Sequence, residues 1–365
     1  MKQLTALLLS AVLLAGMLSG CGSDQTVSSA PAEEAPASVQ EAAPAQEAAP
    51  AEEPAPAEEP APAEEAAPAE EPAPAEEAAS AEDEENYETG DASLDDPRNQ
   101  DDIGETELLV VSFGTSFNDS RRMTIGAIEG ALADAFPEVS VRRGFTAQII
   151  IDHVASRDGE VIDNVTQALD RAVKNNVKTL IVQPTHLMHG FEYTDLMEEL
   201  AQYSDAFETI SVGEPLLSSD EDFSRVADAI VEATKEYDDG DTAICFMGHG
   251  TEAESNEVYA KMQEVLSGKG MEHYFIGTVE ASPSIDDVVE MVKASGCKKV
   301  VLEPLMVVAG DHANNDMAGD DPDSWKSILE AEGFEVTCLL RGLGELEPIR
   351  QLYVEHARAA MDASK

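Results

Sequence analysis

The chain has 365 residues, a formal net charge of −52 at pH 7 and 26% charged residues. So acidic a protein is excluded as a binder of the nucleic-acid phosphate backbone, and it attracts cations. Its four cysteines include no CxxC spacing, which argues against a disulfide framework or a thiolate zinc site. We expect Cys245, Cys297 and Cys338, each in or beside an apolar run, to be small core residues.

Residues 1–21 have the composition of an export signal. They contain a lysine, an apolar run too short for a comfortable membrane span, and small residues before Cys21. The ending Leu18-Ser19-Gly20-Cys21 resembles a bacterial lipobox, which implies cleavage before Cys21 and lipid attachment to its sulfur. An ordinary secretory signal and an uncleaved anchor are the alternatives. All three place the chain outside the cytoplasm, and the lipobox predicts a membrane-anchored lipoprotein.

Residues 22–103 are predicted to be a disordered acidic tether rich in alanine, proline and glutamate. Between residues 51 and 86 the chain repeats a six-residue unit of the type AEEPAP, with almost nothing apolar larger than alanine. Such a segment repels itself and cannot offset the entropy of ordering, so we expect an extended, proline-stiffened chain. A spacer that holds a domain away from a membrane and a segment of no selected length both fit this composition.

The remaining residues, 104–365, alternate short β-branched runs with helical patterns. Strand patterns lie at 106–113, 178–184, 241–250 and 297–308, and helical patterns lie between them, for example at 121–136 and 163–176. This alternation predicts an α/β fold with parallel sheets. In such sheets, functional residues gather where the carboxyl ends of the strands meet the following loops.

The second half of this region repeats stretches of the first. Residues 177–192 align without a gap on 297–312, 110–115 align on 244–249, and 145–150 align on 279–284. Chance is the alternative for each match, but their order and nearly constant offset favour a duplication. We therefore expect two similar Rossmann-like lobes related by a pseudo-twofold axis, with residues 104–235 in the first and 236–365 in the second.

The duplication places polar residues at equivalent strand ends. His249, Glu280 and His312 occupy the positions that hold Thr115, Thr146 and Glu192 in the first half. Two imidazoles and a carboxylate suit a divalent first-row metal and leave a coordination position open for a substrate. Neutral histidine also accepts protons. Taken singly, a histidine of this kind is more often a hydrogen-bonded structural residue.

Several longer motifs carry a family resemblance. They are LLVVSFGTSF (108–117), FMGHG (246–250), GTVEASPSIDDVV (277–289), PLMVVAGDHANNDMAGDDPDSWK (304–326) and GLGE (342–345). Through them, residues 106–360 resemble the CbiK family of anaerobic sirohydrochlorin cobaltochelatases, relatives of class II chelatases such as ferrochelatase. The resemblance implies that a tetrapyrrole binds between two α/β lobes. It implies insertion of Co²⁺, with Fe²⁺ or Ni²⁺ as other candidates, loss of two pyrrole protons and no organic cofactor.

The resemblance also assigns metal handling to His249, Glu280 and His312 in the second lobe. We expect His249 to act as base and ligand, His312 as second ligand, and Glu280 as ligand or catalytic proton acceptor. The acidic run around His312 either guides cations inward or forms a solvated, capped loop. Its candidate residues are Asp311, Asp316, Asp320 and Asp321.

A polycarboxylate tetrapyrrole needs local positive charge on so acidic a protein. The predicted substrate contacts are Gly114, Thr115, Ser116, Arg121, Arg122 and Arg143, with Arg142 beside them. The arginines are alternatively solubilising surface residues. His186 and His189 are expected to be structural, and contact with the macrocycle is the alternative.

The predicted export conflicts with a cytoplasmic biosynthetic pathway. A second hypothesis is therefore a membrane-anchored protein that captures haem, another tetrapyrrole or free metal for uptake. A structural surface protein is disfavoured because the polar residues at the strand ends serve no structural need. The sequence leaves open whether the chain forms a homo-oligomer.

Overall fold

The computed structural model describes residues 89–101 and 103–363, all of which belong to one compact unit. The predicted signal, Cys21 and most of the predicted tether lie outside the described residues. Among the helices that are described, none combines the length and the apolar character needed to cross a bilayer.

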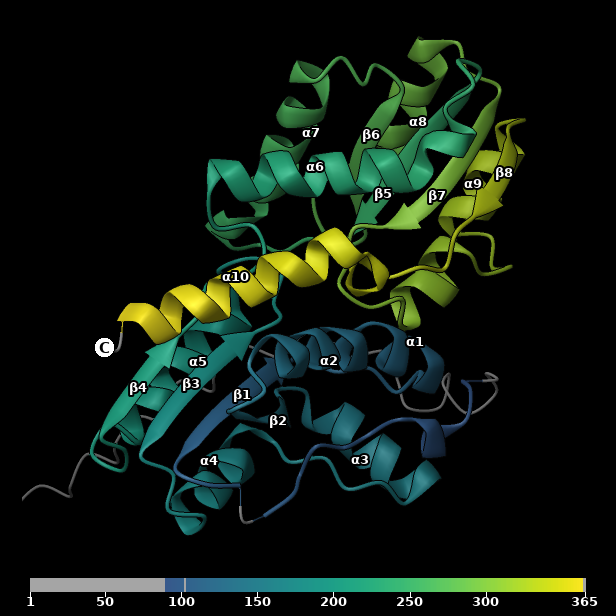
Figure 1. Cartoon of the computed structure of the whole chain (residues 1–365). Helices are drawn as coiled ribbons and strands as arrows, with labels where there is room; N and C mark the ends of the chain where they lie inside the picture. Colours follow the sequence, from purple (N-terminus) through teal and green to yellow (C-terminus); the bar gives the residue numbers. More distant parts are fainter. Residues whose placement is uncertain (1–88, 102, 364–365) are drawn as a thin grey trace, which may run out of the picture. The chain divides into compact units, whose positions relative to one another are not determined.

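The first lobe contains a four-stranded parallel sheet in the order β2-β1-β3-β4 (Figure 1). Its strands are β1 (Thr106–Ser112), β2 (Ser140–Phe145), β3 (Thr179–Pro184) and β4 (Thr209–Val212). Its connecting helices are α1 (Asn118–Met123), α2 (Ile125–Ala135), α3 (Gln148–Asp158), α4 (Val165–Lys174) and α5 (Phe191–Gln202). The central strand β1 is buried from Glu107 to Ser112, as its apolar run predicts.

The second lobe has the equivalent sheet order, β6-β5-β7-β8. Its strands are β5 (Thr242–Gly248), β6 (Tyr274–Thr278), β7 (Lys299–Pro304) and β8 (Glu335–Cys338). Its helices are α7 (Glu257–Gly268), α8 (Ile285–Ser295), α9 (Trp325–Ala331) and the π-helical turn η5 (Ala313–Met317), with short 3-10 turns at Lys235–Tyr237, Glu254–Asn256 and Leu343–Glu345. The shared strand order confirms the predicted α/β fold with two similar lobes.

The two lobes exchange helices. Helix α6 (Asp220–Thr234) precedes the predicted boundary at residue 235, yet it packs against α7, and the hydroxyls of Thr234 and Tyr274 lie 3.3 Å apart. Helix α10 (Glu347–Ala363) comes last in the chain but packs against α2, β3 and β4 (Figure 1). Each sheet is thus covered by a helix from the other half, so the lobe boundary in space differs from the predicted one.

One hydrophobic core extends through both lobes. It contains Leu108 of β1, Phe246 of β5, Val226 of α6 and Leu352 of α10. A second cluster fills the other face of the second sheet and includes Cys245 and Cys297. Cys245 and Cys297 are buried and Cys338 is half-buried against this cluster, which agrees with their predicted role as small core residues.

The fold begins before Gly104. Residues 89–101 lie against the first lobe and include the 3-10 turn η2 (Ala92–Leu94). The side chain of Asp95 is only 3% exposed, because it pairs with the buried guanidinium groups of Arg121 and Arg143. The predicted tether therefore ends earlier than residue 103. We call residues 89–98 the N-terminal strap.

Candidate active site

Loops at the carboxyl ends of both sheets line one cavity of about 790 Å³. The first lobe contributes Gly114–Ser116 after β1, the start of α3 after β2, and residues between 185 and 192 after β3; the second lobe contributes His249–Thr251 after β5, Glu280 after β6, and residues between 306 and 312 after β7. The volume falls within the range of small-molecule sites, about 300–1,000 Å³. The position agrees with the general location of ligands in parallel α/β sheets.

The structure brings together the three residues predicted to handle metal. One potential ligand atom from each of His249, Glu280 and His312 lies within 4.8 Å of the other two. The imidazole rings meet edge to face, with centroids 4.6 Å apart and an angle of 85° between their planes. The backbone N–H of Glu280 donates to the carbonyl of His249 at 2.8 Å, so the loops after β5 and β6 are tied together.

The same ring nitrogen, Nδ1, takes part in a hydrogen bond in both histidines. Nδ1 of His249 lies 2.8 Å from the carbonyl of Gly250, and Nδ1 of His312 lies 2.7 Å from the carboxylate of Asp316. A carbonyl or carboxylate oxygen can only accept, so each Nδ1 carries the proton. Each Nε2 of the neutral rings is then available to a metal, an arrangement typical of histidine ligands that are oriented by a second hydrogen bond.

The surroundings of His312 favour its charged form. Burial alone would lower the pKa of His312. The hydrogen-bonded carboxylate of Asp316, together with the charges of Asp311 and Glu280, outweighs burial and raises the pKa above the usual histidine value of about 6.5. A metal that binds here must therefore displace a proton.

The turn that carries His249 rests on Tyr259, which sequence reasoning did not single out. The backbone N–H of Gly250 donates to the Tyr259 hydroxyl at 3.3 Å. A Cβ on Gly248 would lie 2.1 Å from the Tyr259 ring, so this strand end requires glycine. Burial raises the pKa of Tyr259 to about 12, which keeps its hydroxyl neutral. The glycines on both sides of His249 were the available sequence signal.

The predicted turn Gly114–Ser116 lines the cavity from the first lobe. Gly114 has a φ of 112°, and a Cβ there would lie 2.6 Å from the ring of Phe145, so both its backbone conformation and its surroundings require glycine. A Cβ on Gly310 would lie 3.1 Å from Oγ1 of Thr115. This turn therefore abuts the loop of the second lobe that carries His312.

The arginines predicted to contact substrate lie elsewhere. Arg121, Arg142 and Arg143 are fully buried and paired with carboxylates inside the first lobe. Arg122 pairs with Asp119 and lies outside the cavity lining. No lysine or arginine within residues 89–101 and 103–363 lines the cavity. The expected positive charge near a ligand is thus absent from the described wall, because internal carboxylates already neutralise these guanidinium groups.

Of the two histidines after β3, His186 lines the cavity and His189 does not. His186 lines the cavity, and neither of its ring nitrogens has a hydrogen-bond partner among the described residues. Burial lowers the pKa of His186 to about 4, so its ring is neutral. His189 is exposed, bonds to Glu214 at 2.7 Å and lies outside the lining.

Of the four acidic residues predicted around His312, two lie at or near the cavity and two lie on the surface. Asp311 lines the cavity and Asp316 orients His312. Asp320 pairs with Lys326 on the surface, and Asp321 is exposed outside the cavity lining. Only part of the predicted cation path therefore reaches the cavity wall.

Comparison with known proteins identifies the family. The sequence model of the family described as cobalt chelatase (CbiK) matches residues 106–362, well over half of the chain. The chain belongs to the cobalt chelatase (CbiK) family. Membership confirms the resemblance carried by the sequence motifs. It makes the chain a metal chelatase, for which a divalent metal is a substrate.

Relatives of this cobalt chelatase support the assignment. The sirohydrochlorin cobaltochelatase of Salmonella typhimurium is 36% identical over 255 residues, which cover 70% of this chain and 96% of the relative. Sirohydrochlorin cobaltochelatase CbiKC of Nitratidesulfovibrio vulgaris is 33% identical over 275 residues, covering 74% and 96%. SirB from Bacillus subtilis, solved with Fe³⁺, shares the fold at a TM-score of 0.50 and 14% identity, covering 71% of this chain and 97% of SirB.

Proposed function

We propose that this chain inserts Co²⁺ into sirohydrochlorin with release of two pyrrole protons. The observation that carries the proposal is the convergence of His249, Glu280 and His312, with ligand atoms within 4.8 Å of one another, on the wall of a cavity formed by both lobes. The two named relatives are sirohydrochlorin cobaltochelatases, so the family match favours this activity over tetrapyrrole or metal capture for uptake.

The three proposed ligands suit a metal that is bound reversibly and then transferred to the substrate. Two imidazole nitrogens and a carboxylate accept Co²⁺, Fe²⁺, Ni²⁺ or Zn²⁺ and leave coordination positions open for the pyrrole nitrogens. Asp311 adds negative charge to the wall and draws the cation inward. Because no thiolate takes part, the protein holds the metal by ligands that can be exchanged for the macrocycle.

The same groups can receive the pyrrole protons. His249 bonds through Nδ1 to a neutral carbonyl, which leaves Nε2 as a proton acceptor facing the cavity. We assign His312 mainly to holding the metal, because Asp316 fixes its ring. Glu280 is exposed and can pass a proton on to solvent.

The substrate carboxylates need partners other than arginine. Helices α3 and α5 begin at the cavity, and their N-caps, Ala147 and Gly190, provide no side-chain cap. Their first backbone N–H groups, with those of the turn Gly114–Ser116, are the donors we assign to these carboxylates.

The test is turnover by the purified full-length chain under anaerobic conditions. With Co²⁺ and sirohydrochlorin, the absorption spectrum should convert to that of cobalt-sirohydrochlorin over many equivalents per protein. A parallel titration with haem measures capture. Tight haem binding without any metal insertion would replace the chelatase proposal with the uptake alternative.

We further propose that the chain works outside the cytoplasm, anchored through a lipid on Cys21. The support is the composition of residues 1–21 and the acidic repeat that follows, which would span the distance from a membrane to the folded unit. Both segments lie outside the described residues.

A further inference from the structure

We propose that the N-terminal strap is a positioning element for the metal site, acting through helix α1 and Ser120 on the loop that carries His312. The inference builds on the proposed cobalt insertion, because it assigns a role in that reaction to residues outside the catalytic loops. The family match begins at residue 106, so the strap is an addition to the matched region, yet its key side chain is buried within the first lobe.

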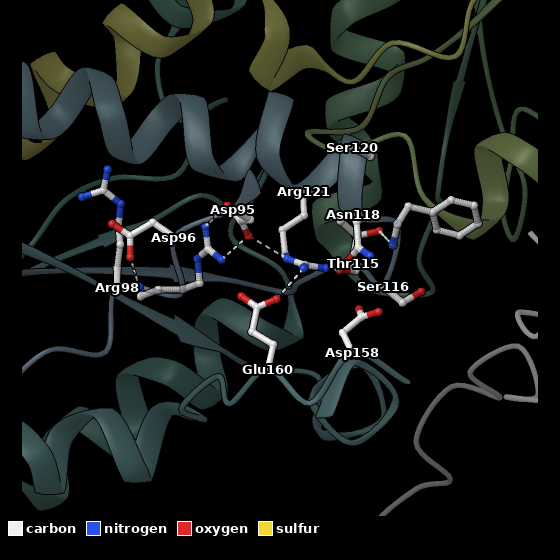
Figure 2. A network of polar contacts seen from close by, with 12 residues as sticks. Asp95, Asp96, Arg98, Thr115, Ser116, Asn118, Ser120, Arg121, Asp158 and Glu160 are labelled. Atoms are coloured by element: carbon white, nitrogen blue, oxygen red, sulfur yellow. Dashed lines mark hydrogen bonds and ion pairs between the residues drawn. The ribbon is translucent and has the colours of Figure 1, made fainter. Parts of the chain in front are cut away.

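Asp95 is the centre of the strap's attachment. Its carboxylate accepts from Nε of Arg121 at 2.8 Å and from Nη1 of Arg143 at 2.7 Å. Figure 2 shows Asp95 and Glu160 on either side of the Arg121 guanidinium, which bonds to Glu160 at 2.8 Å. Burial alone would raise the pKa of Asp95, but Arg143 and Arg121 outweigh it and hold the pKa below its ordinary value. The carboxylate is therefore charged, and Arg121 and Arg143 depend on it for charge balance.

The strap also covers the first turn of α1. The backbone N–H of Asp119 donates to the carbonyl of Thr89 at 2.8 Å, and the side-chain amide of Asn118 donates to the carbonyl of Gly90 at 3.2 Å. A Cβ on Gly90 would lie 2.4 Å from the carboxyl carbon of Asp119, so the strap backbone packs directly against the Asp119 side chain. The bond from Asp119 satisfies a backbone donor that a helix leaves open at its beginning, and both bonds tie the start of α1 to the strap.

From α1, contacts lead to the cavity by two routes. Nη1 of Arg121 donates to the carbonyl of Thr115, in the turn that lines the cavity, at 3.2 Å. The hydroxyl oxygen of Ser120 accepts from the backbone N–H of Ala309 in the second lobe at 3.0 Å. Ala309 precedes Gly310, Asp311 and His312, so this bond fixes the start of the metal-binding loop.

These contacts form one continuous path from the strap to His312. Asp95 holds Arg121, Arg121 and the strap backbone hold α1, and Ser120 of α1 holds Ala309. Small displacements of a ligand loop weaken metal binding, and groups that orient ligands typically contribute about 10–100-fold in metal affinity or activity. Asp95 and Ser120 are therefore positioning residues, and neither contacts the metal.

The experiment compares four variants of the full-length chain. Asp95→Ala breaks the path at the strap and Ser120→Ala breaks it at the lobe contact, while Ser120→Thr keeps the acceptor oxygen. Asp96→Ala is the matched control, because Asp96 is the adjacent, exposed aspartate, whose carboxylate accepts from the backbone N–H of Arg98.

Three readouts separate positioning from stability. Hydrogen exchange of the peptide containing Ala309 reports the lobe contact, Co²⁺ titration of the protein alone by visible absorption reports affinity, and steady-state kinetics report KM for Co²⁺ against kcat. Asp95→Ala and Ser120→Ala should speed exchange at Ala309 and raise both the Kd and the KM for Co²⁺ about 10-fold. Ser120→Thr and Asp96→Ala should stay near wild type.

The outcomes are distinct. A lower melting temperature for Asp95→Ala with unchanged exchange at Ala309 and unchanged KM for Co²⁺ would make the strap a purely structural clasp and overturn the inference. Ser120→Ala leaves the buried ion pairs intact, so it decides the question even if Asp95→Ala does not fold. A wild-type chain that neither binds nor inserts Co²⁺ would refute the proposed function, while exchange at Ala309 would still decide whether the strap controls this loop.

Discussion

His312 and Asp316 face each other across one turn of the helical segment that follows β7, with Nδ1 of the ring 2.7 Å from the carboxylate. This pair leaves Nε2 as the ring nitrogen that is available to the proposed metal. It also makes Nε2 more basic, because the carboxylate stabilises positive charge on the ring. Asp316 thereby strengthens the ligand and increases its competition with protons at the same time.

The first prediction concerns pH. Since the pKa of His312 is raised, protonation should begin to block metal binding above about pH 6.5, the usual histidine value, and activity should fall as the pH decreases through this raised pKa. Asp316→Asn removes the stabilising charge, so the acid limb of kcat/KM for Co²⁺ should move to lower pH. A profile that stays in place in this variant would mean that another group controls the limb.

Alanine variants of His249 and His312 should keep the fold and lose most of the insertion activity. His249 lies on the loop after β5 and His312 lies in the helical turn that follows β7, so little apolar area is lost. One positioned base, in contrast, typically contributes about 10²–10⁴-fold. Because the residues act together, the double variant should be scarcely slower than either single one. Circular dichroism and turnover at saturating Co²⁺ provide the measurements, and rates within a few-fold of wild type for both single variants would contradict the mechanism.

Truncation from the N-terminus should show that the strap contributes to the stability of the fold and that the tether does not. A chain that begins at Thr89 should unfold at the temperature of the full chain, because the acidic repeat has no side chains suited to a core. A chain that begins at Gly104 should unfold several degrees lower, since loss of Asp95 removes one of the two carboxylate partners from each of the buried guanidinium groups of Arg121 and Arg143. Calorimetry decides, and equal midpoints for the two chains would show that the strap adds no stability.

Gly248→Ala should disturb the turn beneath His249. The new Cβ would lie 2.1 Å from the ring of Tyr259, which is fully buried and has no room to move. We expect a lower melting temperature and weaker Co²⁺ binding. Gly268→Ala is the control, because a Cβ at the exposed end of α7 meets nothing within 4 Å and should be neutral or slightly stabilising. Equal effects of the two substitutions would argue against the close contact with Tyr259.

Cys21→Ser tests the proposed anchor. Without the thiol, lipid attachment cannot occur, and the protein should leave the detergent-extracted membrane fraction. Fractionation with mass spectrometry of the N-terminal peptide follows both lipidation and cleavage. Continued membrane association of a cleaved Cys21→Ser chain would assign the anchor to another segment.

The convergence of His249, Glu280 and His312 could be predicted from the sequence because all three follow strand ends. Parallel strands bring their carboxyl ends to one edge, so His249, Glu280 and His312 could be grouped from the duplication and the motifs. Tyr259 and the bond from His312 to Asp316 could not be foreseen, because both depend on the local path of a turn. For Asp316 the sequence left a cation path and a solvated loop open, whereas in the structure its carboxylate bonds to Nδ1 of His312.

The prediction that the arginines contact a substrate was wrong for an electrostatic reason. Strand β2 carries Arg142 and Arg143 among apolar residues, and charged residues in such a run suggest a surface or a ligand. Burial is tolerated because carboxylates distant in the sequence neutralise them, and one of these, Asp95, lay in a segment predicted to be tether. Local composition does not reveal a pairing between such distant residues. The exchange of α6 and α10 between the lobes could not be predicted either. The apolar pattern of a helix shows which face is buried but does not specify which sheet that face covers.

The position of α10 has a consequence for the order in which the molecule can form during synthesis. The core shared by the two lobes takes side chains from Leu108 near the start of β1 to Ala360 near the end of α10. On the ribosome, the first sheet is complete long before the helix that covers it has been made. The part of its apolar face over β3 and β4 must therefore remain without this helix until translation is nearly finished. Deletions within α10 should for this reason yield chains that are recognised by chaperones and proteases as unfinished.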